Sequence, residues 1–328
     1  MLLISPTTPP YLDFSDAPPM LAAVERHMLS LISSQAVDVS GSMHSAAHAS
    51  AYHLGVGGQR VRARLALQAS TATGLTDSDA VCLAATAELL HNASLIHDDI
   101  QDGDEHRRGE PAVWARYGVS TAICAGDLLL SAAYASLCKV KNSSALPELI
   151  ALVHARTSVA VDGQCADLSS REAFTTKINQ SEADALTRST ISAALSRYKA
   201  IAVAKSGALL SLPIELALVL SGNAVASPVA QRAAEAFSIA YQIHDDLNDL
   251  VSDTKSDGAA DTFNIIHVFK TAQVQCDPNS EPPAANAVRL ALAQLDVTEQ
   301  LAATLPNGSG ALLTHYSAQL RRALLSHH

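Results

Sequence analysis

Apolar residues recur at helical spacing along most of the 328-residue chain, and no segment alternates between apolar and polar positions as a strand does. Glycine, proline, asparagine or serine interrupts the apolar runs and so divides them into separate helices. The predicted helices cover residues 18–40, 60–72, 79–102, 119–139, 146–168, 181–198, 201–220, 228–253, 262–275, 283–302 and 310–325. This pattern predicts an all-α fold, a single-domain helical bundle.

The segments between these helices carry boundary signals. An Ala-rich stretch at 44–53 leads into a glycine loop at 55–58, and Thr73-Gly74 ends the helix over 60–72. Asp77 or Ser78 is expected to cap the next helix, because short polar side chains accept from the first free amides. Residues 1–17 are broken by prolines and lack a basic start, so we expect an extended arm and not a targeting signal. The all-α domain is then predicted to span 18–328.

The same acidic pattern ends two of the predicted helices. Residues 96–102 read IHDDIQD and residues 243–249 read IHDDLND. Positions i, i+1 and i+4 share one side of a helix, so each copy gathers three carboxylates that repel one another. The carboxylates are Asp98, Asp99 and Asp102 in the first copy and Asp245, Asp246 and Asp249 in the second. One such motif is often a solvated helix face, but two copies on apolar helices predict a site for a hard cation such as Mg²⁺ with substrate phosphates.

Composition narrows the class of protein. Hydrophobic residues make up 48% of the chain and aromatic residues only 4%, which favours helices around a sizeable core. The net charge of −10 argues against binding to nucleic acid or to an anionic membrane surface. Five scattered cysteines without a CxxC pair predict reduced thiols and a cytoplasmic protein. Every long apolar run contains charge or a helix breaker, so we expect no stable membrane insertion.

Basic residues stand close to the acidic motifs and to the glycine loop. Three arginines follow the loop, two follow the first acidic helix, and Lys205 lies in an apolar helix. The arginines are Arg60, Arg62, Arg64, Arg107 and Arg108. Arginine forms several hydrogen bonds to one phosphate, whereas lysine acts as a point charge. The alternative, an exposed basic face, is weaker because glycine lets a ligand approach the backbone.

Together these motifs resemble the trans-isoprenyl diphosphate synthases, the polyprenyl synthetase family. The stretch 57–62 is similar to the family's GGKRxR, and 98–109 resembles its first aspartate-rich motif with the trailing RRG. Gly126-Asp127 resembles the GD step, 163–168 resembles GQxxDL, and Lys205-Ser206 stands at the family's Lys-Thr. Residues 241–249 resemble the second aspartate-rich motif. The resemblance covers about residues 50–265 and implies an isoprenoid synthase bundle with a central cavity.

The resemblance also implies a reaction and residue roles. Three Mg²⁺ ions with substrate bound would hold the diphosphate of an allylic substrate, whose carbocation is attacked by isopentenyl diphosphate. Catalytic roles fall to Asp98, Asp99, Asp102, Lys205 and Asp245, and metal ligation to both aspartate triplets. The allylic diphosphate would be bound by Arg107, Lys205 and Gln242, and isopentenyl diphosphate by Gln59, Arg62, His91 and Arg108, with Lys255 from the lid loop. His91 could equally be an ordinary helix histidine, and His97 and His244 are expected to pack or to orient carboxylates.

The chain departs from the family pattern at two places. Gln59 replaces the lysine of GGKRxR, which weakens the isopentenyl diphosphate site. The loop after the second motif is shortened, with only Lys255 remaining and Asn264 where the family has proline. Three readings stay open: a chain-elongating prenyltransferase, a terpene-synthase-like or irregular-coupling enzyme, and a non-catalytic partner subunit. The family also implies a homodimer.

Product length is expected to depend on the helix that carries the first motif. Ala93 and Ser94 precede Asp98 by about one turn and are small, where short-product relatives tend to have bulky aromatic residues. An open cavity at this level predicts a product of C20 or longer. Leu90, about one turn further down, could form its floor, although residues on facing helices are equally possible. Ala93 could instead be small because two helices pack closely there.

Overall fold

The computed structural model describes residues 20–33, 45–179, 188–253, 264–276 and 281–326. Helices account for almost all of this part, which confirms the predicted all-α class. The α-helices are α1 Leu21–Ser33, α2 Ala46–Gly55, α3 Val61–Ala72, α4 Asp77–Asp102, α5 Val113–Tyr117, α6 Val119–Leu137, α7 Leu146–Asn179, α8 Arg188–Ala202, α9 Ala208–Leu220, α10 Ser227–Asp253, α11 Ile265–Cys276, α12 Pro283–Ala303 and α13 Ala311–Leu325. Short 3₁₀ turns lie at Ser143–Ala145, Ala224–Ala226 and Pro306–Gly308, and a π-helical turn at Val203–Gly207.

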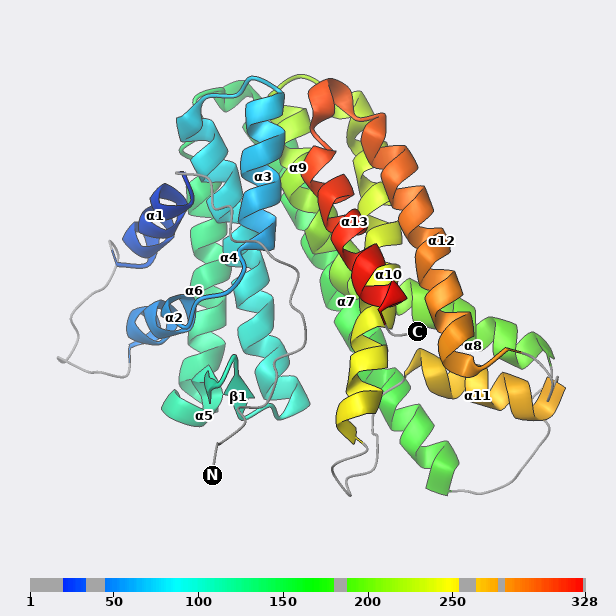
Figure 1. Cartoon of the computed structure of the whole chain (residues 1–328). Helices are drawn as coiled ribbons and strands as arrows, with labels where there is room; N and C mark the ends of the chain where they lie inside the picture. The colour runs from blue at the N-terminus through cyan, green and yellow to red at the C-terminus, as the bar shows by residue number, and fades with distance from the viewer. Residues whose placement is uncertain (1–19, 34–44, 180–187, 254–263, 277–280, 327–328) are drawn as a thin grey trace, which may run out of the picture.

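The bundle is built around α9. Every residue of this helix is buried, which explains why its sequence is apolar on all sides. Helices α3, α4, α7 and α10 pack around it, and α12 and α13 cover α10 on the outside. Figure 1 shows that α4 and α10 both run down the molecule, on either side of α9, and that their C-terminal ends lie at the same end. The two acidic motifs, far apart in the sequence, are therefore brought to one end of the bundle.

Several predicted boundaries are corrected by the structure. The N-cap of α4 is Thr76, whose hydroxyl accepts from the Asp79 amide, so the expected caps Asp77 and Ser78 are wrong. Helix α2 continues through Gly55, which we had placed in the loop. The charged loop at 103–111 contains a small antiparallel hairpin of β1 His106–Arg107 and β2 Glu110–Pro111. The arm predicted at 1–17 lies outside the described residues, and the single domain at 18–328 stays a prediction.

The helix predicted over 201–220 is interrupted by the π-helical turn at Val203–Gly207, which carries Lys205. A π-turn inserts one residue into the helical ladder, and such turns are common at functional sites. Gly163 of α7 packs directly on this turn, since a Cβ there would lie 2.5 Å from the Lys205 backbone nitrogen. The glycine of the GQxxDL stretch thus permits the close approach of α7.

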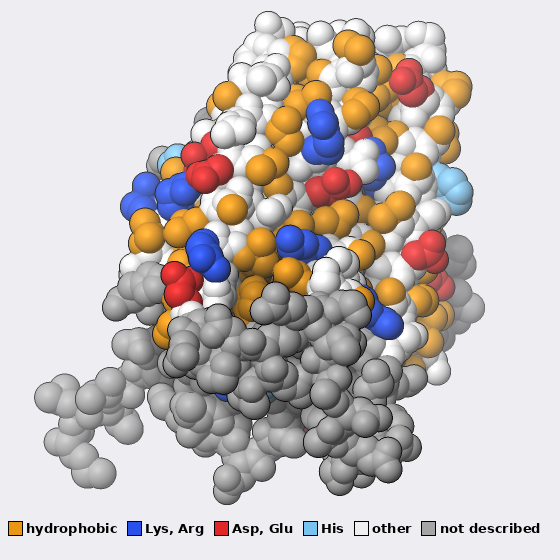
Figure 2. Space-filling model, turned by 90° about the vertical axis from the view of Figure 1, so that its right-hand side faces the viewer, with side chains coloured by type: hydrophobic (Ala, Val, Ile, Leu, Met, Phe, Trp, Pro, Cys, Tyr) orange, Lys and Arg blue, Asp and Glu red, His pale blue; other side chains and the backbone are white. Residues whose placement is uncertain are grey.

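Two helical stretches in the described part are long and apolar enough to cross a membrane by length and composition. The stretch Ser192–Leu220 is 78% buried inside the bundle, and Val119–Leu137 is 39% buried. Both stretches contain charged residues and helix breakers, as expected for long apolar runs of this chain, and the absence of stable membrane insertion stays a prediction. On the face turned to the viewer in Figure 2, the coloured Lys and Arg side chains are interspersed with Asp and Glu.

Candidate functional site

The first acidic motif forms the last turns of α4. Ile96 is buried on the core side of the helix, whereas Asp98 lines a pocket between α4 and α7. The helix stops at Gly103, whose φ of 72° is readily available only to glycine. Burial raises the pKa of Asp98 to about 6, and the neighbouring Asp102 and Asp99 add to the shift against the opposing charge of Lys205.

The middle aspartate of this motif points away from the pocket. Asp99 is 1% exposed and accepts from Arg107 Nε at 2.7 Å, with a second bond from the same guanidinium. Burial raises the pKa of Asp99, and Arg107 opposes that shift. Asp99 therefore ties the β1–β2 hairpin to α4, and its metal ligation stays a prediction.

The second acidic motif lies near the C-terminal end of α10, and here too one aspartate is accessible and the next is buried. The Asp245 side chain is 43% exposed, with the ring of His244 3.7 Å away. The Asp246 side chain is buried and accepts from Tyr198 Oη at 2.9 Å, from Gln242 Nε2 at 3.0 Å and from the Ile265 amide at 2.8 Å. Gln242, expected on the allylic diphosphate, is thus engaged with Asp246. The side chain of Asp249 and all of Lys255 lie outside the described part.

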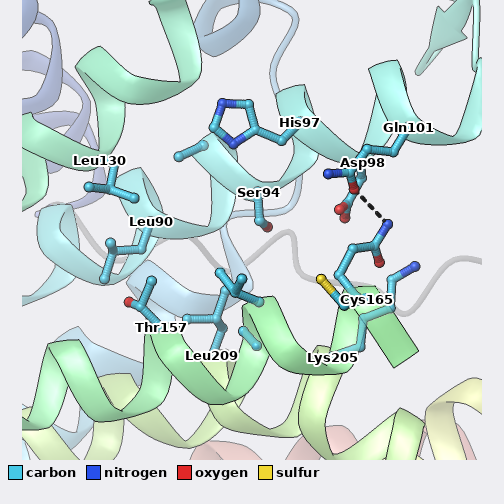
Figure 3. A pocket seen from close by; sticks show the side chains of 14 residues that line it. Leu90, Ser94, His97, Asp98, Gln101, Leu130, Thr157, Cys165, Lys205 and Leu209 are labelled. Atoms are coloured by element: carbon cyan, nitrogen blue, oxygen red, sulfur yellow. Dashed lines mark hydrogen bonds between the residues drawn. The ribbon is translucent and has the colours of Figure 1, made fainter. Parts of the chain in front are cut away.

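The pocket joins an acidic end to an apolar depth. Its cavity volume is about 200 Å³, and it is partly open to solvent. Figure 3 shows Asp98, Gln101 and Lys205 at one end and Leu90, Leu130 and Leu209 at the other, with Ser94 between them. Ala93 also lines the wall. The three residues expected to control product length, Leu90, Ala93 and Ser94, therefore all face the pocket, although their control of length stays a prediction.

The polar end of the pocket is held by the GQxxDL stretch of α7. Gln164 donates to Gln101 at 3.0 Å across the pocket, the dashed line in Figure 3. Lys205 donates to Asp167 at 2.9 Å, with both side chains mostly buried. The motif was visible in the sequence, but these partners for Gln164 and Asp167 were not foreseen.

His97 packs beside this pocket in the role expected for it. A Cβ at Gly126 would overlap the His97 ring, so the GD step leaves space for the imidazole. The ring nitrogen Nε2 lies 3.6 Å from Asp127, the second residue of that step. His97 therefore connects α4 to α6 immediately before Asp98.

A cluster of arginines surrounds the glycine loop. The guanidinium of Arg108 lies against Gly58, where a Cβ would be 2.6 Å from its Cζ, and donates to the Gly57 carbonyl. Arg60 is buried and donates to the Leu54 carbonyl at 2.6 Å and to Glu25 at 3.2 Å. Its remaining nitrogen is 3.6 Å from the buried Glu88. Arg60 and Arg108 thus both hold the loop, and the binding of a ligand by Arg62 and Arg108 stays a prediction.

The buried positive charge of this cluster is suited to the binding of an anion. Burial lowers the pKa of Arg62, whose buried Nε has no hydrogen-bond partner in the structure. Burial together with Arg62 and Arg108 lowers the pKa of His91 well below its ordinary value. Burial and the nearby arginines lower the pKa of His53 to about 3. Both histidines are therefore neutral at physiological pH. Gln59 is half-buried, and its backbone carbonyl accepts a hydrogen bond from Arg64 Nε at 2.9 Å.

The hairpin that carries Arg107 and Arg108 is fixed at both ends. Tyr52 Oη donates to the Pro111 carbonyl at 2.7 Å, and Trp114 Nε1 donates to the Asp104 carbonyl at 2.8 Å. The guanidinium of Arg116 stacks over the Tyr52 ring at 4.3 Å. Sequence reasoning missed Tyr52 and His53, although they immediately precede the glycine loop, and it missed Tyr198, for which no local signal exists.

Among the described residues, no three His, Cys, Asp or Glu side chains converge on one point where an ion could sit. The donor set is nevertheless of the right chemistry: Asp98, Asp102 and Asp245 offer oxygen ligands, and Asp98 is partly desolvated. Mg²⁺ commonly binds through only one or two carboxylates plus substrate phosphates and water. The residues present therefore fit Mg²⁺ when a diphosphate supplies the remaining ligands.

Comparison with known proteins places this geometry in a family. The family model described as Polyprenyl synthetase matches residues 44–263. A short chain isoprenyl diphosphate synthase of Methanothermobacter thermautotrophicus is 34% identical over 202 residues, 60% of this chain and 56% of that protein. A geranylgeranyl diphosphate synthase of Cyanophora paradoxa is 35% identical over 210 residues, 60% of this chain and 62% of that protein. The chain thus spans less than two thirds of the length of either relative.

Solved structures agree in fold. Geranylgeranyl pyrophosphate synthetase from Pyrococcus horikoshii has a TM-score of 0.70 at 20% identity, covering 94% of this chain and 97% of that one. A polyprenyl synthase from Caulobacter crescentus, complexed with calcium and isoprenyl diphosphate, has a TM-score of 0.66 at 22% identity, covering 92% and 94%. The motifs, the isoprenoid synthase fold and the match over 44–263 confirm the predicted resemblance, and the chain belongs to the polyprenyl synthetase family.

Proposed function

We propose that the protein is a Mg²⁺-dependent trans-prenyltransferase that condenses an allylic diphosphate with isopentenyl diphosphate to a longer trans-prenyl diphosphate, of C20 or longer. The observation that carries this proposal is one pocket with carboxylate and lysine at its mouth and leucines in its depth. Such a pocket suits a molecule with a diphosphate head and a hydrocarbon tail. The names of the relatives from Methanothermobacter and Cyanophora support the same activity.

In this proposal Asp98, Asp102 and Asp245 hold Mg²⁺, three ions with substrate bound, and Lys205 and Arg107 donate to the allylic diphosphate. Bound Mg²⁺ would neutralise the charge that develops on the leaving diphosphate. Calcium and isoprenyl diphosphate in the Caulobacter crescentus structure support a metal site of this kind. Arg107 is now paired with Asp99, so it must exchange that partner for phosphate.

The chain's own residues then order the reaction. Arg62, Arg108 and His91 hold isopentenyl diphosphate beside the glycine loop, so that its double bond can attack the allylic carbon as the carbon–oxygen bond breaks. A proton leaves the new chain to the released diphosphate, and no protein base is needed. Leu90, Leu130 and Leu209 keep water from the carbocation. This acyclic elongation needs only positioning and charge stabilisation.

A second candidate function is a terpene-synthase-like or irregular-coupling enzyme, which Gln59 favours because the acceptor site lacks a lysine.

We also propose a homodimer in the cytoplasm. Exposed apolar residues on α6 and α7 (Val119, Ile123, Ile150, Val159 and Val161) supply a surface for a second copy. The thiols of Cys82, Cys124, Cys138 and Cys165 are free, which agrees with a reducing compartment.

The decisive experiment is an assay of purified protein with Mg²⁺ and an allylic diphosphate, with and without isopentenyl diphosphate. We expect elongation only when both substrates are present, and loss of turnover by roughly 100-fold or more in Asp98→Ala and Asp245→Ala. Asp77→Ala, in the exposed first turn of α4, is the matched control. A cyclised hydrocarbon made without isopentenyl diphosphate would support the second candidate, and activity that survives EDTA would exclude the metal site.

Asp98→Asn should remove a pH dependence of stability. The raised pKa of Asp98, about 6 against 3.8, means that native metal-free protein keeps a proton that the unfolded chain has released. The free energy of unfolding therefore falls as pH rises from about 4 to about 6. Asp98→Asn should lack this fall and be more stable than wild type above about pH 6 in EDTA, and less stable in Mg²⁺ with diphosphate. Thermal melts measure both, with Asp77→Asn as control, and superimposable profiles would contradict the expectation.

Gln59→Lys should lower the KM for isopentenyl diphosphate. An amide can donate to phosphate but brings no charge, and a charged donor adds about 1 kcal/mol, or roughly fivefold in affinity. The KM for the allylic substrate should not change, which provides the control within the same assay. Saturation of the wild-type enzyme at low micromolar isopentenyl diphosphate would show that the acceptor site is not weakened.

Ala93→Phe should shorten the products toward C15 and leave folding intact, because the ring would fill the pocket at the level of Ser94. If Ala93 serves helix packing instead, overpacking should cost about 1–3 kcal/mol with no change in products. Ala87 is buried on α4 outside the pocket lining, so Ala87→Phe should lower stability without changing the products and serves as the control. Product chromatography and thermal melts of the two variants decide between these outcomes.

A further inference from the structure

Asp245 and Asp246 are adjacent in the sequence but lie in different environments. The side chain of Asp245 is 43% exposed, whereas Asp246 as a whole residue is only 5% exposed. The three donors to Asp246 come from three helices: Tyr198 on α8, Gln242 on α10 and the Ile265 amide on α11. A buried carboxylate is stable only with such partners, and both of its oxygens accept hydrogen bonds here. Asp246 is therefore built into the packing of three helices.

Asn264 completes this connection at the position where family members have proline. The side chain is 5% exposed, and its Nδ2 donates to the Asp246 carbonyl at 3.1 Å. Its Oδ1 accepts from the Ile266 amide at 2.8 Å, which caps the first turn of α11. Proline has no side-chain donor or acceptor, so neither bond could form in a chain of the usual pattern.

Helix α8, which carries Tyr198, continues through the π-turn that carries Lys205. Tyr198 and Lys205 are seven residues apart, close to two helical turns. The Tyr198–Asp246 hydrogen bond thus fixes the helix of the diphosphate-binding lysine against the helix of Asp245. Helix α11 is fixed to the same point through Asn264 and Ile265.

We infer that Tyr198, Asp246 and Asn264 form a latch that sets the position of Asp245 relative to Lys205, and that Asp246 acts through this latch and not as a metal ligand. The three are positioning residues, and the inference rests on the proposed metal–diphosphate site. In this chain Asn264 supplies two hydrogen bonds in place of the usual proline. The second acidic motif is thereby divided between one ligand, Asp245, and one anchor, Asp246.

The test measures binding of Mg²⁺ with inorganic diphosphate by calorimetry, together with melting of the metal-free protein in EDTA. Tyr198→Phe and Asn264→Ala should lower the melting temperature and weaken binding by roughly 10- to 100-fold, the range found when partners of metal ligands are removed. Thr76→Ala, which removes the N-cap of α4 far from the site, should lower the melting temperature without changing binding. This control separates loss of stability from loss of position.

Variants of the two aspartates should also differ in their effects on binding and on stability. Asp245→Asn is expected to lose binding without lowering the melting temperature in EDTA, whereas Asp246→Asn should lower both. Unchanged binding in Tyr198→Phe and Asn264→Ala, or an Asp246→Asn that loses binding at full stability, would overturn the latch, as would wild-type protein that fails to bind Mg²⁺ with diphosphate. Wild-type binding without chain elongation would instead overturn the proposed reaction and leave the latch test intact.

Discussion

The structure holds several aspartates of like charge together at one end of an apolar bundle, and many of its contacts reduce their mutual repulsion. The carboxylates of α4 and α10 would repel each other along each helix, yet one aspartate of each motif is held by fixed partners. Arg107 pairs with Asp99, and uncharged donors from three helices bind Asp246. Among the described residues, Asp98 and Asp245, the first aspartate of each motif, form no ion pair with an arginine or a lysine. Pairing the middle aspartate of each motif thus leaves the first one available to a cation.

Close helix contacts convert this charge pattern into a fixed geometry. Gly163 lets α7 touch the π-turn, Gly126 accommodates His97, and Gly58 accommodates Arg108. Each glycine lies in a stretch that resembles a family motif, and each leaves space for a backbone or a side chain of the site. The glycines of these motifs are therefore important because a side chain at their positions would fill this space. A methyl group at these positions would meet the backbone at Lys205, the His97 ring and the Arg108 guanidinium, respectively.

The sequence predicted the bundle and the pocket-facing side chains because both follow from local spacing. Helical periodicity places Leu90, Ala93 and Asp98 on one face of α4, and all three line the pocket. The partners of those side chains were not predictable, because Lys205–Asp167 and Tyr198–Asp246 join residues 38 and 48 positions apart. Boundaries failed where a local signal was ambiguous. Thr76, Asp77 and Ser78 could all cap α4, and only the Thr76 hydroxyl reaches the Asp79 amide.

The arginine cluster gives the replacement at Gln59 a physical reason. Burial and the other arginines lower the pKa of Arg108, and arginines also lower the pKa of His91 and His53. Arg60 is paired with Glu25 at 3.2 Å and lies 3.6 Å from Glu88, so these two carboxylates offset only part of the positive charge of the five arginines. A lysine at position 59 would add to that repulsion until a diphosphate arrived. Glutamine would give up part of the attraction for the proposed acceptor diphosphate and would avoid part of the repulsion among the basic side chains. In the proposed function, the charge at position 59 thus balances attraction for the anion against repulsion within the arginine cluster.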